Sequence, residues 1–223
     1  MSATFYFNYI SQPSRAVINL AHLIGADLKL EHLNLATGEH KEPKYLAINP
    51  KGAVPCLVEG DFILSESASI MRYLCDTREA PQHLFPRDDL QKRAKVDGLI
   101  TYSGATLRYA VCYDMIFKVV VPAMKKAGEL PEEEQKAIVE KMHKCFDLLE
   151  ETLEAEKDGF LTGAEISIAD LQIFEELNTL CIVKPDALAK HERVKKWFDT
   201  ITEMARVKEL TEQAGKIMKE MFG

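Results

Sequence analysis

Hydrophobic and polar positions follow two different periods in the first 80 residues, whereas the chain after about residue 88 keeps only the helical one. Residues 3–9, ATFYFNY, are aromatic and predict a strand. Residues 14–24 carry apolar side chains at helical spacing and end at Gly25, which predicts a helix. Residues 28–35, LKLEHLNL, alternate imperfectly and predict a second strand, parallel to the first. Together these segments form a βαβ unit.

Two short apolar runs then lie within residues 53–67, AVPCLVEGDFILSES, and the EGD between them indicates a hairpin. A further helix follows Ser65, with apolar residues at Ile70, Met71 and Leu74. The order βαβ, irregular segment, ββα fits a single sheet with helices on its faces.

The rest of the chain is helical and predicts a second domain. Residues 77–89, TREAPQHLFPRDD, hold two prolines and show no clear period, so the connection between the domains falls there. We therefore predict an α/β domain over residues 1–80, a linker over 81–89 and an all-helical domain over 90–223. The apolar stripes of the second domain, which are typical of core positions, are Ile138, Met142, Phe146, Leu149 and Leu153, then Ile168, Leu171, Phe174, Leu177 and Cys181, then Trp197, Phe198, Ile201 and Met204.

Composition narrows the possible partners. The 223 residues carry a formal charge of −7, which argues against a nucleic-acid or anionic-membrane surface and favours a small-molecule partner. The opening residues do not read as a secretory signal. The most apolar stretch, YAVCYDMIFKVVVPAM, includes Asp114 and Lys118 and is too short for a membrane span.

Cysteine and histidine usage points to a cytoplasmic protein without a metal. The cysteines are odd in number, scattered and without a CxxC pair, as expected of reduced, buried thiols; they are Cys56, Cys75, Cys112, Cys145 and Cys181. The histidines are equally dispersed, so a metal site has no support.

Two stretches carry candidate binding chemistry. Proline is unusual at the start of a strand, and a cis Val54–Pro55 bond would leave the Val54 backbone free to pair with a peptide-like ligand, although composition alone favours an ordinary trans bond. In LSESASI, Ser65 is a candidate helix cap. Alternatively, Glu66 and Ser67 recognise the ammonium and carboxylate of an α-amino-acid head group.

These stretches combine into a resemblance. SQPSRAV after a short strand, then NPKGAVPCLVEGDFILSESASIMRYL, then GAEISIADL in a helical part, resemble the cytosolic glutathione transferases, most closely the theta class. The resemblance covers nearly the whole chain and is strongest over residues 3–80 and 160–171. It implies a thioredoxin-like first domain and a helical second domain, the glutathione transferase fold. SIAD resembles a structural signature of the family and starts a helix with a capping box.

The resemblance assigns the glutathione site. It implies that Val54–Pro55 is cis and that the Val54 backbone pairs with the cysteinyl part of glutathione. Glu66 and Ser67 fall where the family holds the γ-glutamyl end. The glycyl carboxylate is implied to lie at His40, with Lys41 and Lys51 nearby.

Ser11 matches the active-site serine of the theta class. The residues alone also fit a helix cap, since Ser11 lies two positions before Pro13. Ser14, one turn further on, and Tyr6 or Tyr9 at the end of the first strand remain alternative donors to the thiol. Arg108 aligns with a theta-like arginine that faces the sulfur, where it would aid either the sulfur or an anionic leaving group; a solvated helix arginine is the alternative.

The resemblance implies a homodimeric enzyme that adds reduced glutathione, as co-substrate, to a small hydrophobic electrophile. Glutathione-dependent dehalogenation or peroxide reduction is the enzymatic alternative, and a non-catalytic binding module on the same fold is the other. Theta-class chains often carry a C-terminal extension over the active site, whereas this sequence stops soon after KIMKEMFG. We therefore expect a more open pocket unless residues 205–223 pack over Ser11.

Overall fold

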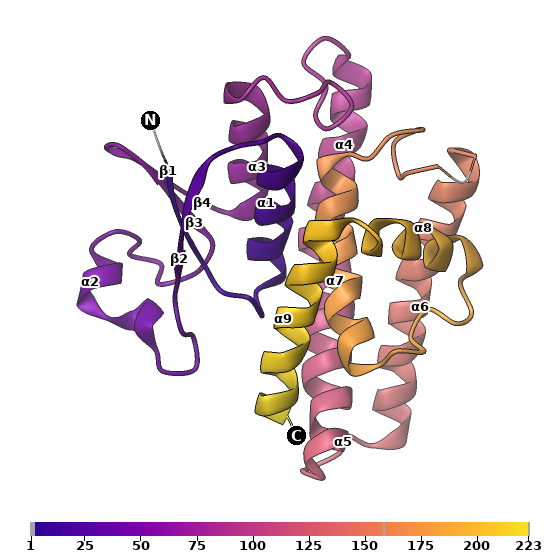
Figure 1. Cartoon of the computed structure of the whole chain (residues 1–223). Coiled ribbons are helices and arrows are strands. Elements are labelled where there is room, and N and C mark those ends of the chain that lie inside the picture. Colours follow the sequence, from indigo (N-terminus) through magenta and orange to yellow (C-terminus); the bar gives the residue numbers. More distant parts are fainter. Residues whose placement is uncertain (1–2, 158, 223) are drawn as a thin grey trace.

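The computed structural model describes residues 3–157 and 159–222, and shows a sheet with its helices beside a larger set of helices (Figure 1). The first part contains β1 (Ala3–Phe7), α1 (Gln12–Leu23), β2 (Leu28–His32), η1 (Glu39–Lys41), α2 (Pro43–Leu46), β3 (Cys56–Glu59), β4 (Phe62–Ser65) and α3 (Ser67–Thr77). The second contains α4 (Leu90–Tyr102), η2 (Ser103–Leu107), η3 (Tyr109–Val120), α5 (Val121–Lys125), α6 (Glu132–Ala155), α7 (Ile168–Val183), α8 (Glu192–Thr202) and α9 (Ala205–Phe222).

The sheet has the topology that the sequence predicts. Its strands lie in the order β2-β1-β3-β4 within the described residues. β1 and β2 are parallel, with Ala3 opposite Leu28, and β3 runs antiparallel to both β1 and β4. The βαβ unit, the hairpin and the mixed sheet are therefore confirmed, as is the α/β part followed by a helical part.

Alternation along β1 sets the first core. Ala3, Phe5 and Phe7 are at most 2% exposed, while the residues between them face the other side of the sheet and are partly exposed. α1 covers the buried face with Ala16, Val17 and Leu20, all fully buried. This packing fixes the start of α1 at the edge of the second part.

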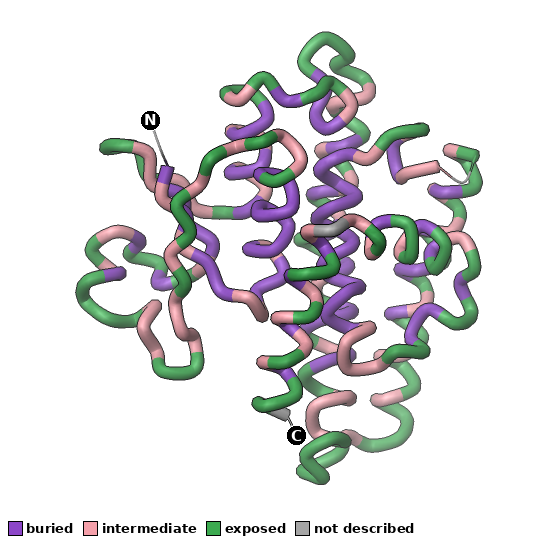
Figure 2. The backbone as a smooth tube through the Cα atoms, in the orientation of Figure 1, coloured by how far each residue is buried: buried purple, intermediate pink, exposed green. Residues whose placement is uncertain are grey.

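α7 is the central helix of the second part (Figure 2). The predicted stripe on α7 is buried as far as Leu177, but the residues between its members are buried too, because α1, α4, η3 and α9 surround the helix. Polar side chains that an amphipathic helix would expose are therefore held inside the protein; they are Gln172, Glu175, Glu176, Asn178 and Thr179.

A buried ion pair joins the two parts. Arg15 of α1 is fully buried and donates from Nε to Glu175 Oε2 at 2.6 Å, from Nη1 to the Tyr9 carbonyl at 2.7 Å and from Nη2 to Thr179 Oγ1 at 2.6 Å. Asn19 Nδ2 donates to the other Glu175 oxygen at 2.8 Å. Because all three nitrogens of the Arg15 guanidinium donate hydrogen bonds, the pair fixes α1 against α7.

The predicted capping box at the start of α7 is confirmed: the Ser167 side chain accepts from the backbone of Asp170, and the Asp170 carboxylate accepts from the backbone of Ser167.

Among residues 3–157 and 159–222, no helix has the length and apolar character needed to span a membrane.

Candidate active site

Ser11 is the N-cap of α1. Its backbone is extended, with φ −81° and ψ 108°, and Pro13 follows in the first turn, where a missing N–H costs nothing. The helix therefore begins at Gln12, two residues before the start at residue 14 that the sequence predicts. As a cap, Ser11 places its hydroxyl at the positive end of the helix dipole.

Ser14 holds the Ser11 hydroxyl from behind. Ser11 Oγ accepts from the Ser14 backbone N–H at 3.3 Å and from Ser14 Oγ at 2.9 Å. Both bonds use Ser11 Oγ as the acceptor, so its own proton is left to donate to a group outside the helix. Ser14 itself is completely buried.

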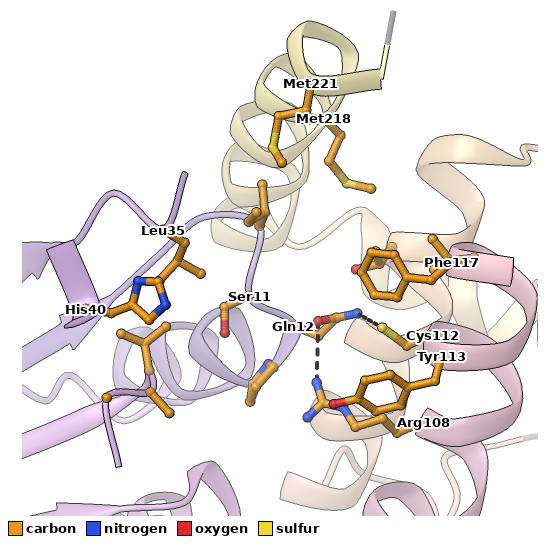
Figure 3. A pocket seen from close by; sticks show the side chains of 17 residues that line it. Ser11, Gln12, Leu35, His40, Arg108, Cys112, Tyr113, Phe117, Met218 and Met221 are labelled. Atoms are coloured by element: carbon orange, nitrogen blue, oxygen red, sulfur yellow. Dashed lines mark hydrogen bonds between the residues drawn. The ribbon is translucent and has the colours of Figure 1, made fainter. Parts of the chain in front are cut away.

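A pocket of about 470 Å³ opens between the two parts beside Ser11 (Figure 3). It brings together four of the predicted site residues, Ser11, His40, Val54 and Arg108. The remaining lining is mainly apolar and is made by Ile10, Gln12, Pro13, Leu35, Gly52, Ala53, Cys112, Tyr113, Ile116, Phe117, Thr179, Met218 and Met221.

The alternative donors lie elsewhere. Tyr6 lines a different pocket, next to Tyr45, with ring centroids 5.4 Å apart. Tyr9 packs its ring against Phe7 and His32. Among Ser11, Ser14, Tyr6 and Tyr9, only Ser11 lines the pocket that contains Arg108.

The loop before β3 is held in one conformation. The Val54–Pro55 bond is cis, as the resemblance implies and against the trans bond that composition favours. Tyr45 Oη and Asn49 Nδ2 both donate to the Ala53 carbonyl, at 2.6 and 2.8 Å. The backbone N–H and C=O of Val54 have no partner within the described residues, so they are open to a ligand.

His40 and Lys41 differ in whether their side-chain nitrogens are already hydrogen-bonded. His40 Nδ1 is buried without a hydrogen-bond partner in the described structure, and the residue lines the pocket. Lys41 Nζ donates to the Gly52 carbonyl at 2.7 Å. Gly52 has φ +55°, and a Cβ there would lie 2.9 Å from the His40 carbonyl and from Lys41 Nζ, so glycine is required. Lys41 thus holds the loop, and His40 keeps a free ring nitrogen.

Glu66 and Ser67 start α3 at the neighbouring end of the sheet. Glu66, with φ 76°, is the residue before the helix, whereas Ser65 ends β4, so the suggested Ser65 cap is wrong. Glu66 Oε1 pairs with Lys51 Nζ at 2.9 Å on the surface, and the buried Ser67 Oγ contacts Gln172 Oε1 at 3.4 Å. A backbone with positive φ at a glutamate costs about 1–3 kcal/mol. Strained conformations of this kind are typical of ligand-binding positions.

Arg108 lies at the junction of η2 and η3, two consecutive segments wound as π-helices. Five residues of this wall line the pocket, and after Arg108 each adjacent pair follows four to five positions later; they are Arg108, then Cys112 and Tyr113, then Ile116 and Phe117. That spacing exceeds the 3.6-residue turn of an α-helix and fits the wider π turn, which is frequent at functional sites. The π-helical winding therefore places these side chains on the same face of the helix, toward the pocket.

Polar contacts fix Arg108 at the base of the pocket. Its Nη2 lies 3.2 Å from Glu176 Oε1 and donates to Gln12 Oε1 at 3.4 Å, and Gln12 Nε2 donates to Cys112 Sγ at 3.3 Å (Figure 3). Burial raises the pKa of the Glu176 carboxyl to about 7, although Arg108 and then Arg15 oppose the shift. Burial also raises the pKa of the Cys112 thiol, so Cys112 stays protonated.

The C-terminal helix forms a wall of the pocket. Met218 and Met221 of α9 line it together with Ser11 and Ile10 (Figure 3). Residues 205–222 thus contribute to the pocket wall. Methionine side chains adapt to ligands of different shape.

Several residues in or beside the pocket escaped the sequence analysis. Gln12 stands next to Ser11 in SQPSR, and Glu176 belongs to an EE pair inside the apolar run DLQIFEELNTL, a pattern that signals buried charge. Cys112, Thr179 and the two methionines carry no such signal, because their positions depend on how the helices pack.

Comparisons with known proteins identify the family. The model for the glutathione S-transferase N-terminal domain matches residues 2–76, and that for the C-terminal domain matches residues 112–204. Glutathione S-transferase theta-3 of Mus musculus is 33% identical over 177 residues, which cover 79% of this chain and 72% of the mouse protein.

Solved structures agree. A human theta-class glutathione transferase, in complex with the glutathione conjugate of 1-menaphthyl sulfate, matches with a TM-score of 0.84 and 28% identity, covering 100% of this chain and 92% of the human chain. A delta-class glutathione transferase of Nilaparvata lugens matches with a TM-score of 0.83 and 29% identity, covering 99% of this chain and 98% of the insect chain. The chain belongs to the glutathione S-transferase family, with theta-class transferases among its relatives.

Proposed function

We propose that this transferase adds reduced glutathione to small hydrophobic electrophiles, and that Ser11 stabilises the glutathione thiolate. The observation that carries the proposal is the Ser11 hydroxyl, which accepts two hydrogen bonds from Ser14 and keeps its own proton for a group in the pocket. Ser11 would donate to the bound sulfur and would not attack the electrophile. The similar human theta-class structure holds a glutathione conjugate, which supports conjugation as the reaction.

Glutathione would lie along the edge that runs from His40 to Ser67. The Val54 backbone would pair with the cysteinyl unit, and His40 would donate to the glycyl carboxylate, supported by Lys41 and by Lys51. Glu66 and Ser67 would hold the γ-glutamyl end. Since Lys51 already pairs with Glu66, the glutathione ammonium would compete with Lys51 for that carboxylate.

Thiolate stabilisation supplies the catalytic gain. A free thiol has a pKa of about 8.5, so only a few per cent is ionised at neutral pH. Lowering that pKa by two units requires about 2.7 kcal/mol, which a charge-assisted hydrogen bond together with the dipole of α1 can provide. Holding both substrates in one pocket adds the benefit of proximity.

The electrophile would bind against the wall made by η3 and α9. Its apolar surface, formed by residues such as Ile116, Phe117 and Met218, suits an uncharged hydrophobic body. Arg108 at the base would stabilise negative charge on the sulfur or on a leaving group.

The test is an ultraviolet difference titration of glutathione bound to the protein, which follows thiolate absorbance against pH. We expect half-ionisation about two pH units below that of free glutathione, because the bound anion receives the Ser11 hydrogen bond. Bound glutathione that ionises at the value for the free thiol would contradict the proposal and favour a non-catalytic binding module. Turnover over a panel of electrophiles, halides and peroxides then separates conjugation from dehalogenation and peroxide reduction.

We further propose a cytoplasmic homodimer. The cysteines are free thiols, as suits a reducing compartment. β4 is an edge strand of the sheet, and it exposes two adjacent large apolar residues, Phe62 at 44% and Ile63 at 46%. A second copy of the chain would bury this edge.

Light scattering tests the dimer. The parent should give twice the chain mass of 25.2 kDa, and Ile63→Glu should shift the population toward monomer because it buries a charge at the contact. Leu30→Glu, an exposed position on the opposite edge strand β2, is the matched control and should remain dimeric. A monomeric parent would exclude the proposal.

A further inference from the structure

Two consecutive glutamates of α7, Glu175 and Glu176, are both buried, but their hydrogen bonding differs sharply. Glu175 is saturated: Arg15 Nε and Asn178 Nδ2 donate to its Oε2, and Asn19 Nδ2 donates to its Oε1. Glu176 has one contact, from Oε1 to Arg108, and its Oε2 is buried without a partner within the described residues. Glu175 therefore serves the fold, whereas the arrangement of Glu176 leaves a buried carboxylate oxygen unsatisfied.

An unsatisfied buried oxygen destabilises a protein, so a structural role alone does not account for it. The side chain is 1% exposed, and its contact with Arg108 is 3.2 Å long. Arg108 also has an unsatisfied group, since among the described residues its buried Nε has no partner, while its Nη2 reaches Glu176 and Gln12. Both groups keep unused hydrogen-bonding capacity beside the pocket.

We propose that Glu176 is a positioning residue, which holds Arg108 against the pocket wall and whose ionisation sets how strongly Arg108 attracts negative charge in the pocket. The ionised carboxylate neutralises the guanidinium and draws it toward α7. The protonated carboxyl leaves the positive charge of Arg108 uncompensated and available to a ligand. The inference deepens the proposed function, because it rests on the pocket beside Ser11 as the electrophile site.

The charged and titratable surroundings of Glu176 support this role. Arg15 faces it from α1, Arg108 from the η2–η3 junction, Cys112 from η3 and Glu175 from α7 itself. Arg15 is already bound to Glu175, and Cys112 is a protonated thiol. Arg108 is thus the cation whose charge is free to respond to Glu176. Burial places the pKa of Glu176 at about 7, inside the range where its charge changes near neutrality.

The experiment measures ligand binding without glutathione, so that its failure is distinct from failure of the conjugation proposal. The probes are an anionic fluorophore, an anilinonaphthalene sulfonate, and an uncharged aminonaphthalene of similar size. Affinity of the parent for the anionic probe should be about tenfold higher at pH 6 than at pH 8, since a shift of one pKa unit corresponds to a tenfold change in binding. Affinity for the uncharged probe should be constant.

Variants locate the effect. Glu176→Gln keeps the shape of the side chain and removes its charge, so binding of the anionic probe should become independent of pH and at pH 8 reach the strength the parent has at pH 6. Arg108→Met should abolish the preference for the anionic probe at both pH values. Glu140→Gln, an exposed glutamate on α6, is the control and should behave as the parent.

A flat pH profile for the anionic probe in the parent overturns the inference, and this readout needs no variant, so it holds even where Glu176→Gln fails to fold. A pH dependence that persists unchanged in folded Glu176→Gln also overturns it, because the titrating group then lies elsewhere. Equal pH dependence for both probes would do the same.

Discussion

Replacing Ser11 with alanine should lower conjugation turnover at neutral pH about a hundredfold while glutathione affinity changes little. A hydrogen bond to a charged group contributes about 1.5–3 kcal/mol, which corresponds to a factor of roughly 10 to 150. The affinity survives because Val54, His40 and Ser67, which would hold the rest of glutathione, are untouched. The pH at which half of the bound thiol ionises should rise toward that of free glutathione, so turnover should partly recover at high pH. Steady-state kinetics over pH, with titration of the bound thiol, measure both effects.

Ser14→Ala is the matched control, because Ser14 is fully buried behind Ser11 and does not itself line the pocket. This variant keeps the Ser11 hydroxyl and the backbone bond from residue 14, and loses only the 2.9 Å bond that orients Oγ. Turnover should therefore fall several-fold, far less than in Ser11→Ala, in keeping with the loss of a neutral hydrogen bond worth about 1 kcal/mol. The reverse ranking of the two variants would identify Ser14 as the donor.

How far the sequence predicts this molecule depends on whether a feature is local. Ser11 with Pro13 marks a helix start, the EGD turn marks a hairpin, and Ser167 with Asp170 marks a capping box, because each depends on residues a few positions apart. These local rules locate the elements. The helix boundary at Gln12 and the correction of Ser65 lie within the one- or two-residue freedom of helix ends.

Features that depend on packing were not predictable in the same way. The run from Tyr109 to Val120 is so rich in apolar residues that an α and a π winding give nearly the same pattern, and only the structure shows which side chains face the pocket. α7 reads as amphipathic but is enclosed on all sides, so its polar residues lie inside. The contact between Arg108 and Glu176 joins positions 68 residues apart along the chain, and no local pattern indicates it.

The family resemblance predicts which residues form the glutathione site, and the structure shows which of these residues line the pocket and which already bond to other parts of the protein. Ser11, His40, Val54 and Arg108 share one pocket. Lys41 bonds a loop carbonyl and Lys51 pairs with Glu66, so each lysine already has a contact within the protein. The resemblance places His40, Lys41 and Lys51 together, because the sequence contains no information on which of them is already bonded.

Replacing Asp170 with alanine should lower the free energy of unfolding by about 4 kcal/mol or more. The Asp170 side chain is completely buried and accepts from four donors: the Leu161 N–H at 2.8 Å, the Ser167 N–H at 2.8 Å, Ser167 Oγ at 2.6 Å and Trp197 Nε1 at 2.9 Å. Its loss leaves three buried N–H groups unpaired, and each unsatisfied group costs about 1–3 kcal/mol. It also removes the Asp170 half of the capping box, so that Ser167 alone caps the central helix. Urea unfolding, followed by far-ultraviolet circular dichroism, measures the loss.

The matched control is Asp199→Ala, because Asp199 lies on α8, two residues after Trp197, yet is 57% exposed and pairs with Lys195. An exposed ion pair of this kind contributes about 0.2–1 kcal/mol, so its removal should shift the unfolding midpoint only slightly. Trp197 is the single tryptophan of the chain, and its indole N–H contacts Asp170 but not Asp199, so its fluorescence should change in the folded state of Asp170→Ala and stay constant in Asp199→Ala. Equal destabilisation by the two variants would show that Asp170 stabilises the helix only as a surface charge would, and that the bonds joining α7, α8 and the loop at Leu161 contribute little to the fold.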